Sequence, residues 1–178
     1  MAGLIFSAKK NNKGVNRVYK ISSEQMSKIK ATVSKGLEAQ EAVFNTLDFN
    51  PYDDEGAGGY DSVVMERERY EGERKERIES PTAYGVCETD EREAEIVAGA
   101  ALTQEEERSL NENIFEHDDT LMVITKLSDG ADEVLAVTVQ QIWGQAGLHV
   151  INFLGFFAND DDAQKAIEAA DYVTFEEG

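Results

Sequence analysis

The chain lacks the residue types from which covalent, redox and metal sites are built. Its 178 residues include one cysteine, Cys87, which excludes an internal disulfide and any Cys-x-x-Cys motif. Its two histidines are His117 and His149, and His149 falls in a strand-like pattern, where histidine is more often a sheet residue than a base. We therefore expect no enzyme, no cofactor and no catalytic residue.

Motifs for phosphate and calcium are also lacking. The cluster Gly56, Gly58 and Gly59 is not followed by the Lys-Ser/Thr pair of a phosphate loop, and acids surround it. Of three carboxylate clusters, "PYDDEG" lacks EF-hand spacing, and "ANDDDA" is typical of a helix start. The third, "EHDD" at 116–119, is the most ligand-like but favours a helix-end loop. We expect no nucleotide site and no metal site.

Long apolar runs are missing. The start, "MAGLIFSAKK", has only three apolar residues in a row, fewer than a signal peptide needs. No later run approaches the roughly 18 residues of a membrane span. We expect a soluble cytoplasmic protein, found in the host cytoplasm if the chain is viral.

Positive charge is scarce and unevenly placed. The chain has 17 Lys/Arg against 36 Asp/Glu, a net charge of -19. Residues 1–35 hold eight Lys/Arg and one acid, so residues 36–178 hold nine Lys/Arg and 35 acids. Such an acidic body repels nucleic acid and anionic membranes and attracts basic protein surfaces. A role in solubility alone is the simpler alternative.

The N-terminal third predicts a hairpin followed by a helix. The runs "GLIFSAKK" and "GVNRVYKI" flank the turn-forming "NNKG", which indicates a basic β-hairpin. Ser22 and Gln25 have capping-box spacing, and apolar residues then recur at helical spacing over 23–47. Gly36 lies inside this helix, where we expect a kink or a break.

The middle of the chain is rich in charge and poor in apolar periodicity. Residues 48–61 combine Pro51 with glycines and acids, which indicates a loop or linker. The run "MERERYEGERKERIE" at 65–79 predicts an exposed helix with almost no apolar face. Three tyrosines lie in this acidic stretch: Tyr52, Tyr60 and Tyr70. They indicate either a segment that docks on a basic, partly apolar groove or, more simply, a solvated loop.

The C-terminal half predicts helices and then strands. Two short helices follow in series at 89–102 and 103–115, the second with Thr103 and Glu106 in capping-box spacing. From residue 120, three apolar runs joined by turn residues predict an antiparallel meander covered on both faces. A capped helix at 159–170 and a closing strand at 172–175 complete an α+β fold.

The predicted organisation has three segments. Residues 1–47 form the basic hairpin and amphipathic helix, and 48–88 form a charged linker with an exposed segment. Residues 89–178 form the acidic helices and the sheet, in one globular domain with 1–47.

The acid density at 88–119, with twelve Asp/Glu and two arginines, carries the leading functional hypothesis. Helical turns display carboxylates at spacings comparable to the roughly 7 Å between phosphates along a strand. We predict a non-catalytic inhibitor of phage or mobile-element type that imitates nucleic-acid charge and binds a basic nucleic-acid-binding protein, without touching nucleic acid or membranes. Its partner-binding residues are Asp53, Asp54, Glu55, Glu91, Glu95, Glu105, Glu106, Glu107, Glu112, Asp118 and Asp119.

The alternative hypothesis is a viral structural or assembly component. In this interpretation the basic N-terminal hairpin pairs with the acidic body of a second copy, which gives a homo-oligomer, located in the virion. The self-association residues are Lys9, Lys10, Lys13, Arg17 and Lys20.

Overall fold

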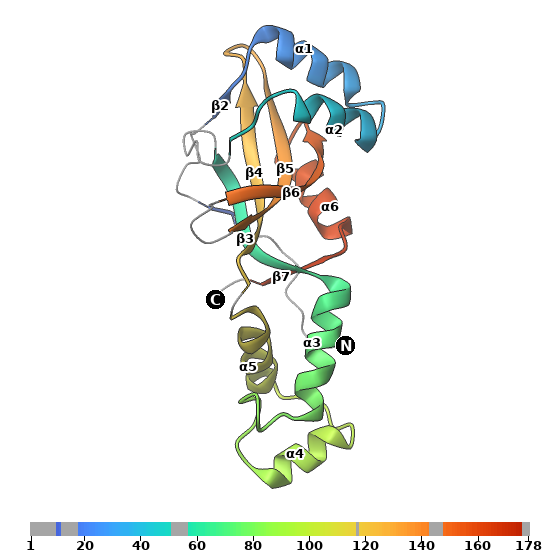
Figure 1. Cartoon of the computed structure of the whole chain (residues 1–178), viewed down its shortest axis with the longest axis vertical. Helices are drawn as coiled ribbons and strands as arrows, with labels where there is room; N and C mark the ends of the chain where they lie inside the picture. Colours follow the sequence, from blue (N-terminus) through green and yellow to red (C-terminus); the bar gives the residue numbers. More distant parts are fainter. Residues whose placement is uncertain (1–9, 12–17, 51–56, 117, 143–147, 176–178) are drawn as a thin grey trace. The chain divides into compact units, whose positions relative to one another are not determined.

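The computed structural model describes residues 10–11, 18–50, 57–116, 118–142 and 148–175, with the backbone alone for 10, 11 and 57–62 (Figure 1). The described residues divide into two compact units. The sheet unit comprises residues within 7–62 and 119–170, and the helical unit comprises 63–118 and 171–175. The α+β class expected from the sequence is confirmed.

The sheet unit is built on the predicted meander. Its strands β4 (Thr120–Ser128), β5 (Glu133–Ile142) and β6 (Leu148–Phe157) pair antiparallel in sequence order. The β4–β5 turn is closed by the Asp129 carboxylate, which accepts hydrogen bonds from the backbone N–H groups of Ala131 at 2.9 Å and Asp132 at 2.8 Å. Gly130 in that turn has φ of +97°, a value that favours glycine. Turn chemistry therefore sets the register of the longest ladder.

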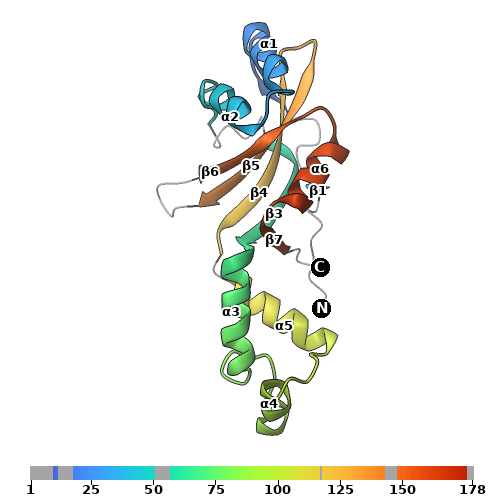
Figure 2. The same cartoon turned by 90° about the vertical axis from the view of Figure 1, so that its right-hand side faces the viewer.

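Helices cover both faces of the meander, as predicted. Helices α1 (Ser23–Thr32) and α2 (Leu37–Asn45) pack one face, and Figure 2 draws α2 and α6 (Asp160–Ala169) on opposite sides of the strands. Phe44 of α2 stacks on Phe153 of β6 with ring centroids 4.5 Å apart. The buried residues of this core are Met26, Ile29, Phe44, Leu47, Leu127, Val134, Ala136, Phe153 and Phe156. Alternate residues of β5, Val137 and Val139, are equally buried, so neither face of this strand faces water.

The predicted helix over 23–47 is broken at the glycine. The capping box at its start is present, since Ser22 and Gln25 exchange side-chain to backbone hydrogen bonds of 2.8 and 3.0 Å. Gly36 has φ of +93° and is the N-cap of α2. A residue with a side chain is strained at this φ, and the chain turns here to fold α2 back beside α1.

The outer strand β6 is irregular and partly capped by α2. Its register with β5 shifts twice, between Val137 and Thr138 and between Val139 and Gln140. The buried Gln40 side chain accepts a 2.9 Å hydrogen bond from the backbone N–H of Phe156. A Cβ at Gly155, whose φ is +131°, would lie 3.2 Å from the same Gln40 oxygen. Bulges and a capping side chain are devices that protect a sheet edge from pairing with other strands.

Two details of the N-terminal half differ from the sequence prediction. Among the described residues, β1 (Lys10–Asn11) pairs antiparallel with β3 (Ala57–Glu66), and β2 (Tyr19–Lys20) pairs parallel with β4. These parts of the expected hairpin therefore do not pair with each other. The predicted linker contains β3, whose partners lie far away in sequence and give no local signal.

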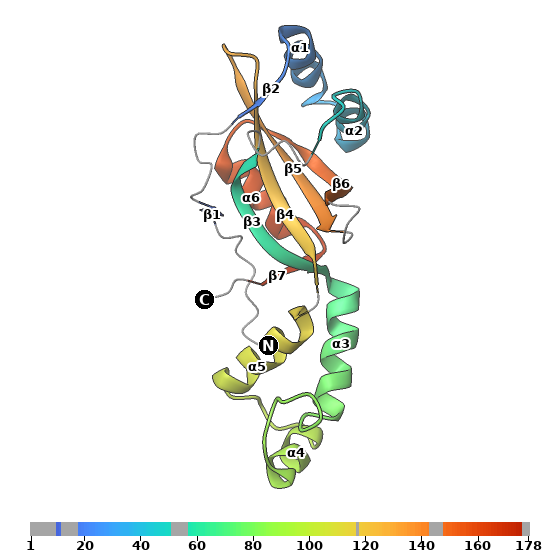
Figure 3. The same cartoon turned by 60° about the vertical axis from the view of Figure 1, so that its left-hand side comes forward.

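The helical unit contains α3 (Arg67–Glu79), α4 (Asp90–Val97), α5 (Gln104–Phe115) and the strand β7 (Tyr172–Phe175). The last residues of β3 pair antiparallel with β7, from Val63 with Phe175 to Glu66 with Tyr172. The two series helices and the closing strand were predicted. Figure 3 shows α3 beside α5, with α4 at the end of the unit away from β7.

The core of the helical unit corrects the prediction that 65–79 has almost no apolar face. Tyr70 of α3 is fully buried, and its ring stacks on Phe115 of α5 at 5.8 Å between centroids. Its hydroxyl donates to the side-chain oxygen of the buried Asn111, and burial raises the pKa of the phenol. The buried members of this core are Met65, Tyr70, Val86, Leu110, Ile114, Phe115 and Val173.

No helix in the described part of the chain combines the length and apolar character needed to cross a membrane.

Candidate binding surface of the helical unit

Both acidic helices begin at a threonine that caps the backbone. Thr89 accepts a 3.1 Å hydrogen bond from the N–H of Arg92 at the start of α4. The Thr103 hydroxyl accepts a 3.1 Å bond from the N–H of Glu106, and the Glu106 carboxylate accepts a 2.9 Å bond from the N–H of Thr103. This capping box was predicted from the spacing. Acids in the first turns favour both helix starts, because the exposed N–H groups there carry partial positive charge.

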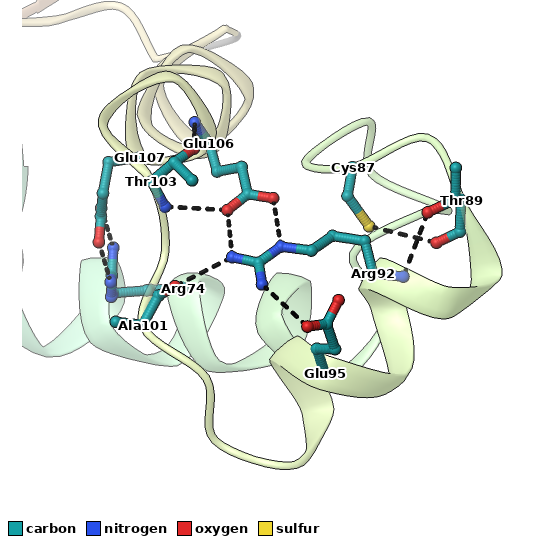
Figure 4. Close-up of polar contacts among 9 residues, drawn as sticks. All are labelled: Arg74, Cys87, Thr89, Arg92, Glu95, Ala101, Thr103, Glu106 and Glu107. Carbon is teal, nitrogen blue, oxygen red and sulfur yellow. Dashed lines mark hydrogen bonds and ion pairs between the residues drawn. The ribbon is translucent and has the colours of Figure 1, made fainter.

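Arg92 ties α4 to α5 (Figure 4). Its Nε donates to Glu106 at 2.8 Å and its Nη2 donates to the other carboxylate oxygen at 2.7 Å. Nη2 also donates to the backbone oxygen of Ala101 at 3.0 Å, and Nη1 lies 3.8 Å from Glu95. The guanidinium and the Thr103 cap together lower the pKa of Glu106 to about 2.

Arg74 ties α3 to α5 in the same way. Its two terminal nitrogens donate to the two oxygens of Glu107 at 2.8 and 2.7 Å. The side chains are 19% and 15% exposed, so water screens this pair only weakly. The hydrogen bonds from Arg74 to Glu107 raise the pKa of the guanidinium. Bidentate geometry of this kind fixes the relative rotation of two helices as well as their distance.

Three acids predicted to bind a partner are engaged inside the unit. Glu106 and Glu107 form the bridges above, and the side chain of Asp118 is only 2% exposed and accepts a 3.3 Å bond from Arg69. A carboxylate held in this way would have to give up its arginine before it could bind a partner. The capping-box spacing of Glu106 was the one sequence signal for such a role.

Four other predicted acids lie on the surface of α4 and α5. Glu91, Glu105 and Glu112 are exposed, with no ion pair among the described residues, and the Glu95 side chain is 62% exposed. Asp119 is also exposed but belongs to the sheet unit. The predicted residues Asp53, Asp54 and Glu55 lie outside the described residues.

The sequence prediction omitted two residues of this surface. Glu88 and Asp90, at the start of α4, are exposed and have no ion pair in the described part of the chain. Their position beside the capping residue Thr89 was the available signal, since acids gather in the first turn of a helix.

The predicted basic self-association residues are described only in part. Lys20 in β2 is exposed, and Lys10 is placed by its backbone in β1. Lys9, Lys13 and Arg17 lie outside the described residues.

Within the described ranges, no three His, Cys, Asp or Glu side chains are grouped as a metal site would require. Comparison of the chain with protein-family models, with curated proteins and with solved structures gives no match.

We expect the stabilisation from the ion pair of Glu106 with Arg92 to depend on pH. A carboxyl whose pKa is lowered on folding stabilises the fold above its ordinary pKa of 4.5, and this contribution disappears as the pH falls toward about 2. We expect Glu106→Gln, which can keep the cap but loses the charge, to unfold at lower urea concentration than the parent at pH 6. The difference should shrink steadily between pH 4.5 and 2.

Urea titrations of both proteins at several pH values, followed by circular dichroism, measure this difference. Glu105→Gln, one residue away and exposed, is the matched control. Its difference from the parent should be small, and much smaller at pH 6 than that of Glu106→Gln. A Glu106→Gln difference that is independent of pH would contradict the ion pair.

Proposed function

We propose that the chain is a non-catalytic binding protein whose helical unit presents exposed carboxylates to a basic cleft of a nucleic-acid-binding protein. The observation that carries the proposal is the division of acids on α4 and α5 into two groups. One group forms ion pairs inside the unit: Glu106 with Arg92 and Glu107 with Arg74. The other is exposed and has no ion pair among the described residues: Glu88, Asp90, Glu91, Glu105 and Glu112.

The spacing of the exposed acids supports the proposal. Glu91 and Glu95 are one helical turn apart, roughly 6 Å along the axis, and Glu105 and Glu112 are two turns apart, roughly 10.5 Å. The first of these distances is comparable to the roughly 7 Å between phosphates along a strand, which a basic cleft for nucleic acid is built to hold. The positive surface of the partner would then be attracted to the unit at long range, and salt would weaken the attraction.

The rigidity of the display also supports the proposal. Arg92 joins α4 to α5, and Arg74 joins α3 to α5, each through two hydrogen bonds to one carboxylate. Side chains on helices fixed in this way lose less conformational entropy on binding than side chains on loose segments. A phage or mobile-element inhibitor of a host protein is the setting that best fits such a display.

The test is capture of bacterial proteins on the immobilised chain, with a salt gradient and with DNA as competitor, and identification of the captured proteins by mass spectrometry. We expect basic nucleic-acid-binding proteins that salt and DNA both release. Replacing Glu91, Glu95 and Glu105 by Gln should lower the affinity for a captured protein at least tenfold, or about 1.4 kcal/mol.

The matched control also removes three exposed acids, but from the sheet unit: Glu38→Gln, Glu41→Gln and Glu133→Gln. It should bind as the parent does. Equal loss of affinity in both triple variants would mean that net charge alone is responsible. Capture that DNA leaves unchanged would count against charge mimicry.

The predicted alternative, self-association through Lys9, Lys10, Lys13, Arg17 and Lys20, stays a prediction, because most of these side chains lie outside the described residues.

A further inference from the structure

Two exposed apolar turns on the chain carry opposite charge. One joins α4 to α5 in the helical unit, and the other joins α1 to α2 in the sheet unit. Five large apolar side chains are exposed among the described residues. One of them lies at the first turn, Val97 at 56%, and two lie at the second, Val33 at 44% and Leu37 at 47%.

The acidic corner is formed by residues of α4 and of the turn that follows it: Glu91, Glu95, Val97, Ala98, Ala100 and Ala101. All six are exposed. The turn has a fixed shape, because the N–H of Ala100 donates to the backbone oxygen of Glu95 at 2.9 Å. Arg92 contacts both the Glu95 carboxylate and the backbone oxygen of Ala101, so this carboxylate lies beside the apolar turn (Figure 4).

The lysine corner is formed by the end of α1, the turn that follows it and the first residue of α2: Lys30, Val33, Ser34, Lys35 and Leu37. Residues 25–37 contain three lysines and no acid, in a chain with 36 acids. The turn is also fixed, since the backbone N–H of Lys35 donates to Thr32 and the Gln40 side chain donates to the backbone oxygen of Val33. Lys30 is paired with Asp132, whereas Lys35 has no ion pair in the described part of the chain.

We propose that the acidic corner of one copy docks on the lysine corner of a second copy. The contact brings Val97 and its neighbouring alanines against Val33 and Leu37, and brings the Glu91 and Glu95 carboxylates to Lys35. An exposed apolar patch rimmed by charge is characteristic of protein contact sites, and here the partner patch with the opposite charge is on the same chain. This inference does not depend on the proposed function.

The geometry of the contact is heterologous. One such contact joins the acidic corner of one copy to the lysine corner of the other, and the remaining two corners can take part in further contacts. The apolar area at each corner is small, and contacts of less than about 1,200 Å² are weak encounters, so we expect a dissociation constant on the order of 100 µM.

The experiment is sedimentation equilibrium of the full chain over a range of concentrations, with paired charge-reversal variants. One variant reverses the acidic corner (Glu91→Lys, Glu95→Lys), and the other reverses the lysine corner (Ser34→Glu, Lys35→Glu). We expect the average mass of the parent to rise with concentration and that of each variant alone to stay near one chain.

A mixture of the two variants provides the decisive test of the contact. The first variant carries two basic corners and the second carries two acidic corners. In the mixture, basic corners therefore meet acidic corners of the other protein, so association should return. Val97→Ser and Leu37→Ser remove only exposed apolar surface and should each weaken association at least threefold, which keeps the test valid if a reversal variant fails to fold.

A parent that remains one chain at 1 mM would overturn the inference, as would association that neither reversal changes. Association lost in both variants but not restored in the mixture would also overturn it. Retained capture of a basic protein by the Ser34→Glu, Lys35→Glu variant would separate this contact from the proposed function.

Discussion

Replacing Tyr70 by Ala should destabilise the helical unit by about 3–5 kcal/mol, the range found for large aromatic side chains removed from a core. The Tyr70 ring is fully buried between α3 and α5, where it stacks on Phe115, which in turn stacks on Phe175 of β7 at 5.2 Å. Its removal leaves a cavity at the point where these three elements meet.

Hydrogen exchange followed by mass spectrometry can locate this effect. Peptides from α3 and α5 should exchange much faster in Tyr70→Ala than in the parent, because exchange reports the local free energy of opening. Peptides from β4 and β5 in the sheet unit provide the internal comparison.

Tyr70→Phe is the matched variant, because it keeps the ring and removes only the hydroxyl that donates to Asn111. We expect a cost of about 1–2 kcal/mol, since the buried Asn111 oxygen loses its donor. If Tyr70→Ala behaved like a surface substitution, the core described for the helical unit would be wrong.

Replacing Glu107 by Ala should destabilise the helical unit by about 3 kcal/mol, because it leaves the Arg74 guanidinium largely buried without its partner. Glu105→Ala, two residues earlier in the same helix and exposed, should change stability by no more than about 0.5 kcal/mol. Urea unfolding of the three proteins gives the comparison.

The double variant Arg74→Met, Glu107→Leu separates two effects: the loss of the whole ion pair, and the burial of one charge without its partner. Replacing a buried ion pair by apolar side chains of similar size is often neutral, so the double variant should recover most of the stability lost in Glu107→Ala. The single variants Arg74→Met and Glu107→Leu complete the cycle. A loss of stability in the double variant equal to the sum of the two single losses would show that the residues do not interact.

The ion pairs of Glu106 and Glu107 limit which acids of α5 can be replaced in a binding test. Neutralising Glu105, Glu106 and Glu107 together would remove one exposed acid and two internal bridges, so a loss of binding could come from unfolding. Variants limited to Glu91, Glu95 and Glu105 avoid this ambiguity, because these side chains are exposed and none of them forms a close bridge.

The elements that the sequence predicted well are those with local physical causes. The capping boxes at Ser22 and Thr103 and the turn at Asp129 are formed by residues within three positions of each other. The break at Gly36 follows from the backbone freedom of one residue. The meander follows from apolar runs separated by turn residues, so its three strands could be placed from the chain alone.

The sequence therefore determined the α+β class, the order of most helices and strands, and the strongly acidic character of α4 and α5. Tertiary structure alone decided that Tyr70 is a core residue, that β3 is a strand, and that Glu107 forms an ion pair with Arg74. Arg74 and Glu107 are 33 residues apart in sequence, and the ends of β3 pair with segments as far away as β7. Such partners meet only after the chain has folded, because hydrophobic burial and strand pairing join segments without regard to their separation along the chain.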